Sequence, residues 1–499
     1  MFLIRSSIVF VISIIALSIA DRGSDNQSKK INRELRKYKL ADISEEISSL
    51  RNEVRGLMEK VCLKPAEEIF IGNLIHSITS SWTTRCKFAV QAGKDVNADP
   101  TILPGYDFVV DDCYNTSGTS TLTSSIEDID RFVAYYNKIK EQAIPFIIHG
   151  KSVVPDLRTF CAAKGCISVA NWAASVETLE APLSTDSLND VLIIGRTIVK
   201  IVERYGWKYV GLFYPDREHQ KGKFIEQLKT NLEANGVEVD AFETYGVADI
   251  DWAAIKQRDL RIFVADVSRS AQPKFLCELY KYNLTGEKYI LMHKSNPTLN
   301  YFTEDQMANA NCTREQIDEA REGALQLTLL PENYFEGGNV NLTEPKHYRS
   351  GKSYVDILSD IGEEVPPKKP FVFAGGAYDA VWAFALALKA TFQEEGVVPG
   401  EANAFLRTMD GIEKLYANLM KVDFDGVTGP YTYNANGLRN YYVNVGTMRG
   451  DGVTIRGVGK YDAKTDVLSP FNESLIWQFK GGKPISDGRN YTSHETGDN

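Results

Sequence analysis

The residues best suited to bind a small molecule follow a short apolar segment, AIPFII (143–148). The motif HGKS (149–152) comes next, and a helix is expected over 154–164. A strand, a glycine turn and a serine at the helix N-cap leave free N–H groups at the positive end of the helix dipole. This junction predicts an anion site suited to a carboxylate. The alternative is that Ser152 only caps its helix.

A second segment of this kind follows the apolar residues Ile167–Val169. It runs from Trp172 through two alanines to Ser175. Small side chains and a hydroxyl at the end of a strand can also receive a carboxylate, and an ordinary strand-to-helix turn is the alternative.

Patterns typical of catalysis are missing from the sequence. It has no GxSxG, HExxH, P-loop or GxGxxG in a suitable context, and none of its six histidines has a metal-like partner at i+3 or i+4. Asp111 and Asp112 are interpreted as a solvated strand end, and the hydroxyl-rich stretch 115–125 as a polar loop. The sequence therefore predicts a binding module that is not an enzyme and uses no cofactor or metal.

Chain length and net charge further limit the kinds of protein that this sequence can encode. With 499 residues the chain is long enough for two lobes, and its net charge of −10 argues against a nucleic-acid partner. Residues 1–20 resemble a signal peptide, because a basic start precedes a 13-residue apolar run that ends in Ser18-Ile19-Ala20. No later apolar stretch is long enough to span a bilayer. We expect a secreted protein, or one on the extracellular face of the plasma membrane.

Export predicts disulfides and glycans. The chain has seven cysteines with neither CxxC nor zinc spacing, and because the count is odd one thiol is free or pairs with another chain. Seven glycosylation sequons are expected to lie on the surface: Asn26, Asn115, Asn283, Asn311, Asn341, Asn472 and Asn490.

A polar segment (21–39) is followed by apolar residues spaced 3-4-3-4-3-4 along 40–64. This heptad pattern predicts a short coiled coil or, equally, an amphipathic helix lying on its own domain. Cys62 directly follows the seam, so a parallel pair of such helices would bring two copies of Cys62 together. Cys62 is therefore the candidate for an interchain bridge.

From about residue 68 short apolar strands alternate with helices. Strands are expected at 69–75, 106–110, 143–148, 167–169, 208–213, 261–267 and 289–292, and helices at 86–97, 126–140, 154–164, 191–205, 221–235, 273–282 and 377–389. Two consecutive sets of this kind predict two doubly wound α/β lobes with parallel sheets, an arrangement that resembles the clamshell of type I periplasmic binding proteins. Ligands bind beyond the carboxyl ends of such strands, so the cleft between the lobes is the expected site.

Several segments resemble the extracellular module of GABA-B receptors. They are CELYKY (277–282), GEKYI (286–290), NCTREQ (311–316), YGWKYV (205–210), AYDAVWAFALAL (377–388), FDGVTGP (424–430) and ILPGYDF (102–108). Their order and spacing over about 68–480 suggest the Venus-flytrap module of class C G-protein-coupled receptors. Receptor guanylyl cyclases share this fold and are the nearest rival.

The resemblance implies a domain layout and a mode of action. Lobe 1 is expected over 68–188 plus about 371–440, lobe 2 over 189–370 plus about 441–480, and a polar tail over 481–499. A small ligand would bind one lobe and close the other upon it. A homo- or heterodimer with a related module is the expected assembly, and any membrane segment would lie outside this chain.

The resemblance also places ligand-binding residues. Trp82 falls on a cleft tryptophan and Ser152 on the carboxylate-binding serine, while a further serine of the family aligns near Ala174 or Ser175. Four other positions differ from the family in their chemistry. Ser268 stands where the family has a tyrosine, Asn296 where it has a tryptophan, and Leu188 where it has a histidine. Phe373 stands where the family has the glutamate that would hold a ligand amine. γ-Aminobutyrate itself is therefore not expected, while a carboxylate-bearing ligand remains possible.

Disulfides follow from the same resemblance. Cys277–Cys312 matches the bridge of the second lobe, Cys113 is expected to pair with Cys86, and Cys161 with Cys166, which leaves Cys62 over. Three functions stay open: a GABA-B-like ectodomain that binds ligand or only supports a partner subunit, a secreted soluble binder, and a guanylyl cyclase ectodomain.

Overall fold

A computed structural model describes residues 66–489 except for 75–79, 112–142, 150–160, 171–182, 187–189, 215–220, 244–246, 268–270, 295–301, 303, 330–342, 365–371, 436 and 450–454. The chain divides into Met1–Ala66 and a compact unit, Glu67–Asn499. The predicted signal peptide, polar segment, heptad helix and Cys62 lie outside the described residues.

The first lobe is built on a five-stranded parallel sheet in the order β2-β1-β3-β4-β5. Its strands are β1 (Glu67–Leu74), β2 (Tyr106–Val110), β3 (Phe146–His149), β4 (Ile167–Ala170) and β5 (Ser184–Asp186). Parallel strands covered on both faces need apolar residues throughout, and Phe146, Ile147 and Ile148 are each 0% exposed.

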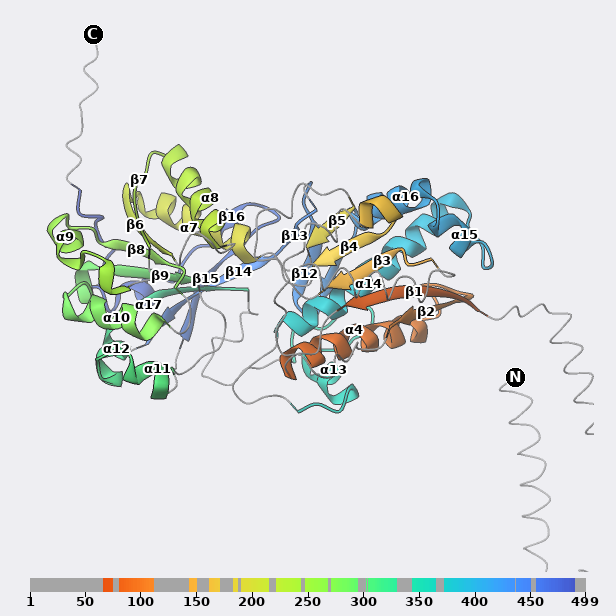
Figure 1. The fold of residues 1–499 in the computed structure, drawn as a ribbon, viewed down its shortest axis with the longest axis horizontal. Helices are drawn as coiled ribbons and strands as arrows, with labels where there is room; N and C mark the ends of the chain where they lie inside the picture. Colours follow the sequence, from red (N-terminus) through yellow and green to blue (C-terminus); the bar gives the residue numbers. More distant parts are fainter. Residues whose placement is uncertain are drawn as a thin grey trace, which may run out of the picture. The chain divides into compact units, whose positions relative to one another are not determined.

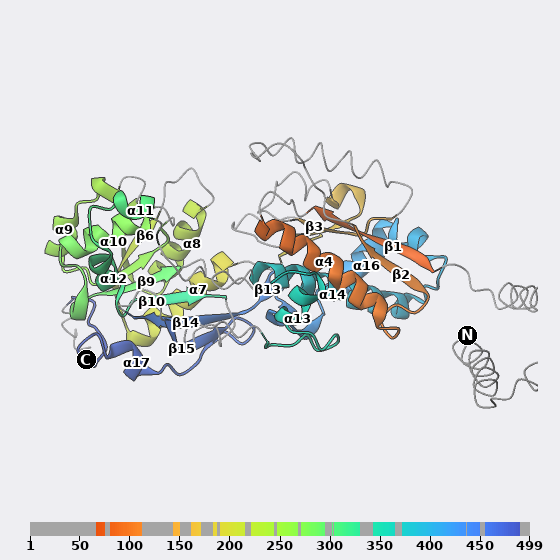
Figure 2. The same ribbon diagram turned by 90° about the horizontal axis from the view of Figure 1, so that it is seen from below.

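Two long helices form the core of this lobe with the sheet. They are α4 (Ser80–Ala98) and α14 (Val372–Glu395), which pack directly against each other and lie side by side in Figures 1 and 2. The ring of Phe384 on α14 stacks on Phe146 of β3 with centroids 4.1 Å apart. The remaining helices of the lobe are α13 (Tyr354–Asp360), α15 (Ala402–Leu406) and α16 (Met409–Leu419).

A small antiparallel sheet completes the first lobe: β11 (Asp423–Gly426), β12 (Gly429–Tyr433) and β13 (Arg439–Asn440). It is tied to α14 by Asp379, whose carboxylate accepts hydrogen bonds from the backbone N–H of Val427 at 2.9 Å and of Thr428 at 3.0 Å. Burial raises the pKa of Asp379, while the guanidinium of Arg439, 3.6 Å away, opposes the rise. A Cβ at Gly426 would lie 2.4 Å from this carboxyl group, so the FDG motif needs its glycine.

The second lobe is built on an eight-stranded sheet in the order β16-β15-β14-β10-β9-β8-β6-β7. Five strands are parallel: β6 (Tyr209–Tyr214), β7 (Glu238–Glu243), β8 (Ile262–Ala265), β9 (Ile290–Lys294) and β10 (Leu325–Thr328). The last three are antiparallel additions from the end of the chain: β14 (Tyr442–Met448), β15 (Ile455–Asp462) and β16 (Val467–Leu468).

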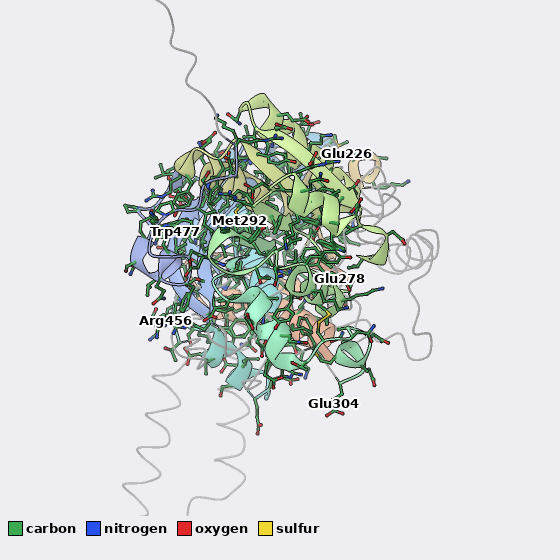
Figure 3. The ribbon with its side chains drawn as sticks, turned by 90° about the vertical axis from the view of Figure 1, so that its left-hand side faces the viewer. Glu226, Glu278, Met292, Glu304, Arg456 and Trp477 are labelled. Atoms are coloured by element: carbon green, nitrogen blue, oxygen red, sulfur yellow. A yellow bond between two sulfur atoms is a disulfide. The ribbon has the colours of Figure 1, made fainter. Side chains whose placement is uncertain are left out.

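Helices cover both faces of this sheet, each over its own apolar cluster. One cluster contains α7 (Asp190–Tyr205), α8 (Lys221–Ala234) and α17 (Glu473–Trp477), and the other α9 (Trp252–Gln257), α10 (Gln272–Lys281) and α12 (Arg314–Arg321). Met292 of β9 is 0% exposed, while Glu226 and Glu278 label α8 and α10 in Figure 3. Short elements fill the connections: η2 (Val247–Asp249), η3 (Gly286–Lys288) and α11 (Glu304–Ala308).

The packing differs from the expected domain layout at two places. Helix α13, expected in lobe 2, packs against α4 and belongs to the first core. The segment expected to be a polar tail from 481 contacts the second lobe as far as Arg489, which pairs with Glu238 of β7. Ile485 is 7% exposed, and its carbonyl accepts a hydrogen bond from the indole Nε1 of Trp207 at 2.8 Å. An apolar side chain and a satisfied indole hold this segment, so the tail implied by the resemblance does not begin at 481.

Candidate functional site

The first-lobe residues predicted to bind ligand follow neighbouring strands. Trp82 is the third residue of α4, which follows β1, while Ser152 and Ser175 follow β3 and β4 and lie outside the described residues. The register pairs Leu74 with His149, and His149 with Ala170, so the carboxyl ends of β1, β3 and β4 are adjacent. All three predicted residues therefore follow one edge of the sheet, where doubly wound folds bind ligands.

One buried cation lies on the same helix as Trp82. Arg85 is one turn further along α4 and is 5% exposed. Burial lowers the pKa of Arg85 to about 10, and the phenol of Tyr354 opposes this effect. The guanidinium remains charged at neutral pH, so it places a positive charge near the start of α4.

The second-lobe residues also follow adjacent strands. Ser268 comes three residues after the end of β8 and Asn296 two residues after β9, and both lie outside the described residues. The parallel register pairs Ala265 with His293, so the two strands end side by side. Phe373 is the second residue of α14.

Sequence reasoning missed a group of buried polar residues at this edge of the second sheet. Their exposed fractions are 2% to 9%: Asp266, His293, Gln326, Thr328 and Asn444. Gln326 pairs with His293 in the register, and Thr328 with Asn444, so the group extends across β9, β10 and β14. A polar residue within an otherwise apolar parallel strand was the signal that could have revealed them.

Of the three predicted bridges, one is present, one is absent, and for the third only Cys86 is described. The predicted Cys277–Cys312 disulfide is present and links α10 to the segment before α12 (Figure 3). Cys86 is disulfide-bonded as expected. Its predicted partner, Cys113, lies outside the described residues.

The expected Cys161–Cys166 bridge was wrong, because both residues are free and buried. The backbone N–H of Cys166 donates to the carbonyl of Cys161 at 2.9 Å, and Gly165 turns the chain with φ 73°. Burial and hydrogen bonding between the two thiols raise the pKa of Cys161. Oxidation proceeds through the thiolate, so this environment slows formation of the bridge.

Three of the predicted glycosylation sites are described, and all three are exposed on the second lobe: Asn283, Asn311 and Asn472. The other four lie outside the described residues. Among the residues that the structure describes, no group of His, Cys, Asp and Glu could hold a metal ion. None of the helices described is long and apolar enough to cross a membrane.

Comparison with known proteins identifies the family. The profile described as "Receptor family ligand binding region" matches residues 87–451. The chain belongs to this receptor family. It is 25% identical to the mouse (Mus musculus) gamma-aminobutyric acid type B receptor subunit 1 over 433 residues, which covers 84% of this chain and 42% of the mouse protein.

Relatives from Caenorhabditis elegans point the same way. Its gamma-aminobutyric acid type B receptor subunit 1 is 24% identical over 299 residues, covering 58% of this chain and 31% of the relative. Its gamma-aminobutyric acid type B receptor subunit 2 is 27% identical over 201 residues, which cover 38% of this chain and 22% of the relative. These similarities support a Venus-flytrap module like those of class C G-protein-coupled receptors. The chain spans about two-fifths of the length of the mouse relative, 42%.

Proposed function

We propose that this receptor-family module lies outside the cell and closes on a small carboxylate-bearing ligand to control G-protein-coupled signalling. The observation that carries the proposal is the HGKS junction, which ends β3 at His149 and continues toward Ser152. It follows the sheet edge at which parallel α/β lobes bind ligands. A serine and free backbone N–H groups at a helix start suit a carboxylate.

Signalling by such a module requires a ligand that distinguishes two states. A ligand that binds the open and closed forms equally well leaves their populations unchanged. We infer that Trp82 and Ser152 on the first lobe hold the ligand, and that the segments around Ser268 and Asn296 on the second lobe contact it on closure. With Phe373 in place of a glutamate, an amine would have no carboxylate at that position.

A dimer with a related module is the proposed assembly. The relatives are named as two receptor subunits, and the heptad pattern over 40–64 offers a parallel contact that ends at Cys62. Non-reducing gels of wild type and Cys62→Ser test the interchain bridge. A disulfide-linked dimer in the wild type alone is expected, and a monomer in both would contradict the bridge.

The ligand hypothesis is tested by thermal stability against a panel of amino acids and small acids. A ligand at 100 times its Kd should stabilise the protein by about 2.7 kcal/mol. Ser152→Ala should weaken binding of the ligand that stabilises the wild type. An unchanged Kd would make Ser152 a helix cap and nothing more.

The matched control is Ser353→Ala. Ser353 caps α13 by accepting a hydrogen bond from the N–H of Asp356, so its loss should cost about 1 kcal/mol of stability and leave ligand affinity unchanged. If no compound stabilises the wild type, the ligand proposal fails. Support of a partner subunit without ligand, which the loss of the glutamate at position 373 favours, then becomes the better account.

A further inference from the structure

The last segment that the structure describes, residues 480–489, crosses the amino-terminal edge of the second sheet. The parallel strands all begin at this edge, where β10, β9, β8, β6 and β7 are neighbours in that order. The segment, which we call the strap, begins at the turns before β10 and β9. It ends where Arg489 pairs with Glu238, the first residue of β7, at 2.6 Å. The strap therefore lies at the edge opposite the one at which parallel α/β lobes bind ligands.

Lys480 anchors the first end of the strap. Its side chain is 6% exposed, and its Nζ atom donates to the carbonyls of Gly286 at 2.9 Å and Glu322 at 3.2 Å. These carbonyls belong to the turns before β9 and β10, and a buried carbonyl needs a donor. The contact is close, because a Cβ at Gly323 would lie 2.9 Å from Cε of Lys480. This end is therefore fixed in the body of the lobe.

Residues 485–489, which we call the latch, hold the other end of the strap. The carbonyl of Ile485 accepts from the indole Nε1 of Trp207 at 2.8 Å. The carboxylate of Asp487 is buried and accepts from the backbone N–H of Lys208 at 2.5 Å. Both donors come from the two residues before β6, so the latch supplies acceptors to the start of that strand.

The end of the latch fits closely against the neighbouring strands. Gly488 has φ 86°, and a Cβ added there would lie 2.2 Å from the carbonyl oxygen of Asp259, before β8. Only glycine fits at this position. The guanidinium of Arg489 lies over the ring of Tyr209 at 4.0 Å from the ring centre.

The chain between these two anchors has few contacts. Residues 481–484 are all exposed. Gly481 and Gly482 have φ 72° and 78°, and a Cβ added at Gly482 would meet no described atom within 4 Å. Glycine populates many backbone conformations, and segments with few buried contacts open locally. The glycine pair therefore has the properties of a hinge.

We propose that the latch opens and closes as a conformational switch, swinging about Gly481 and Gly482 while Lys480 stays in place. In the closed state the chain after Arg489 leaves the lobe beside β7. In the open state it leaves from the glycine pair, beside β9 and β10. The exit point then moves by three to four strand spacings, roughly 14–19 Å. The switch does not depend on which ligand the module binds.

Hydrogen exchange of the full chain, followed by mass spectrometry, tests the latch at the amide of Lys208. In Gly488→Ala the added Cβ forces the latch away from Asp259, so this amide should exchange about tenfold faster or more. Gly236→Ala is the matched control, because Gly236 also has a positive φ (70°) but a Cβ there meets no described atom within 4 Å. It should leave the exchange of Lys208 unchanged. Equal exchange in Gly488→Ala and wild type would overturn the proposal.

A second variant opens the latch from the lobe side. Trp207→Phe removes the donor to the Ile485 carbonyl and keeps an aromatic ring, so exchange at Lys208 should rise about fivefold. No rise in this variant would contradict the latch. Unchanged protection in β8 and β9 would show that the lobe stays folded.

The hinge is tested in the same two variants, at the amides of Lys480 and Gly482. Both amides donate to the carbonyl of Trp477 at 2.8 Å, on the fixed side of the strap. We expect their exchange to match the wild type while that of Lys208 rises. If Lys480 and Lys208 lose protection by the same factor, the strap detaches as a whole and the hinge at Gly481 and Gly482 is wrong.

Discussion

Replacing His347 tests how burial of a histidine makes the first lobe sensitive to acid. The imidazole is 0% exposed and packs against the rings of Trp382 and Phe424. Its Nδ1 atom accepts hydrogen bonds from the backbone N–H groups of Arg349 and Ser350, both at 3.3 Å. Burial lowers the pKa of His347 to about 3, so the folded protein keeps the ring neutral.

The size of the effect follows from the two pKa values. In the unfolded chain the pKa of this histidine is about 6.5. The pKa of His347 is lower in the folded protein than in the unfolded chain. Its titration therefore leaves the free energy of unfolding unchanged above about pH 6.5 and lowers it as the pH falls toward about 3. The loss is about 2 kcal/mol at pH 5 and about 4–5 kcal/mol at pH 3.

Asn is the most informative replacement for His347, because its amide oxygen can still accept from the two N–H groups and it does not titrate. At pH 7.5 His347→Asn should lower the free energy of unfolding by about 1–3 kcal/mol, since it leaves space among the rings. At pH 5 the difference from wild type should be smaller by about 2 kcal/mol. Urea unfolding followed by tryptophan fluorescence measures both differences.

Ser350→Ala is the matched control from the same loop. It removes a hydroxyl that lies 2.9 Å from that of Tyr378, and it should cost the same stability at both pH values because serine does not titrate. Equal losses for wild type and His347→Asn between pH 7.5 and pH 5 would refute the reasoning.

Three further perturbations test the packing by equilibrium unfolding. Asp379→Asn should cost about 3–5 kcal/mol, because it leaves the buried Arg439 without its countercharge; a cost below about 1 kcal/mol would contradict the pairing. Burial lowers the pKa of Lys480 to about 8, which is below the pKa of a lysine in the unfolded chain. Because the unfolded chain then binds more protons, titration of Lys480 should raise the free energy of unfolding of the wild type by about 2 kcal/mol between pH 7.5 and 9.5. That rise should be absent from Lys480→Met. An equal rise in wild type and variant would show that Lys480 does not cause it. Replacing Cys277 and Cys312 together by serine opens a loop with a sequence separation of 35 and should cost about 4 kcal/mol, whereas an unchanged urea midpoint would show that the bridge contributes nothing.

Local pattern predicted the elements that alternate between buried strand and helix. The expected strand at 106–110 coincides with β2, and the helix expected over 191–205 differs from α7 by one residue at its start. Runs of apolar residues in these segments are a property of a few neighbouring positions, so they can be read without the rest of the chain. The strand β7 was missed, because its alternating acids belong to an exposed sheet edge.

Pairing between distant segments was decided only by the tertiary structure. The register of β10 with β14 joins Gln326 to Gly446, more than a hundred residues apart, and nothing in either segment specifies the other. For the same reason the sequence placed Ser152 after a strand, but could not show that Asp266 is buried beside β6. Whether a polar side chain is shielded from water depends on the residues that pack around it. Those neighbours come from distant parts of the sequence, so only the folded lobe determines which polar residues are buried.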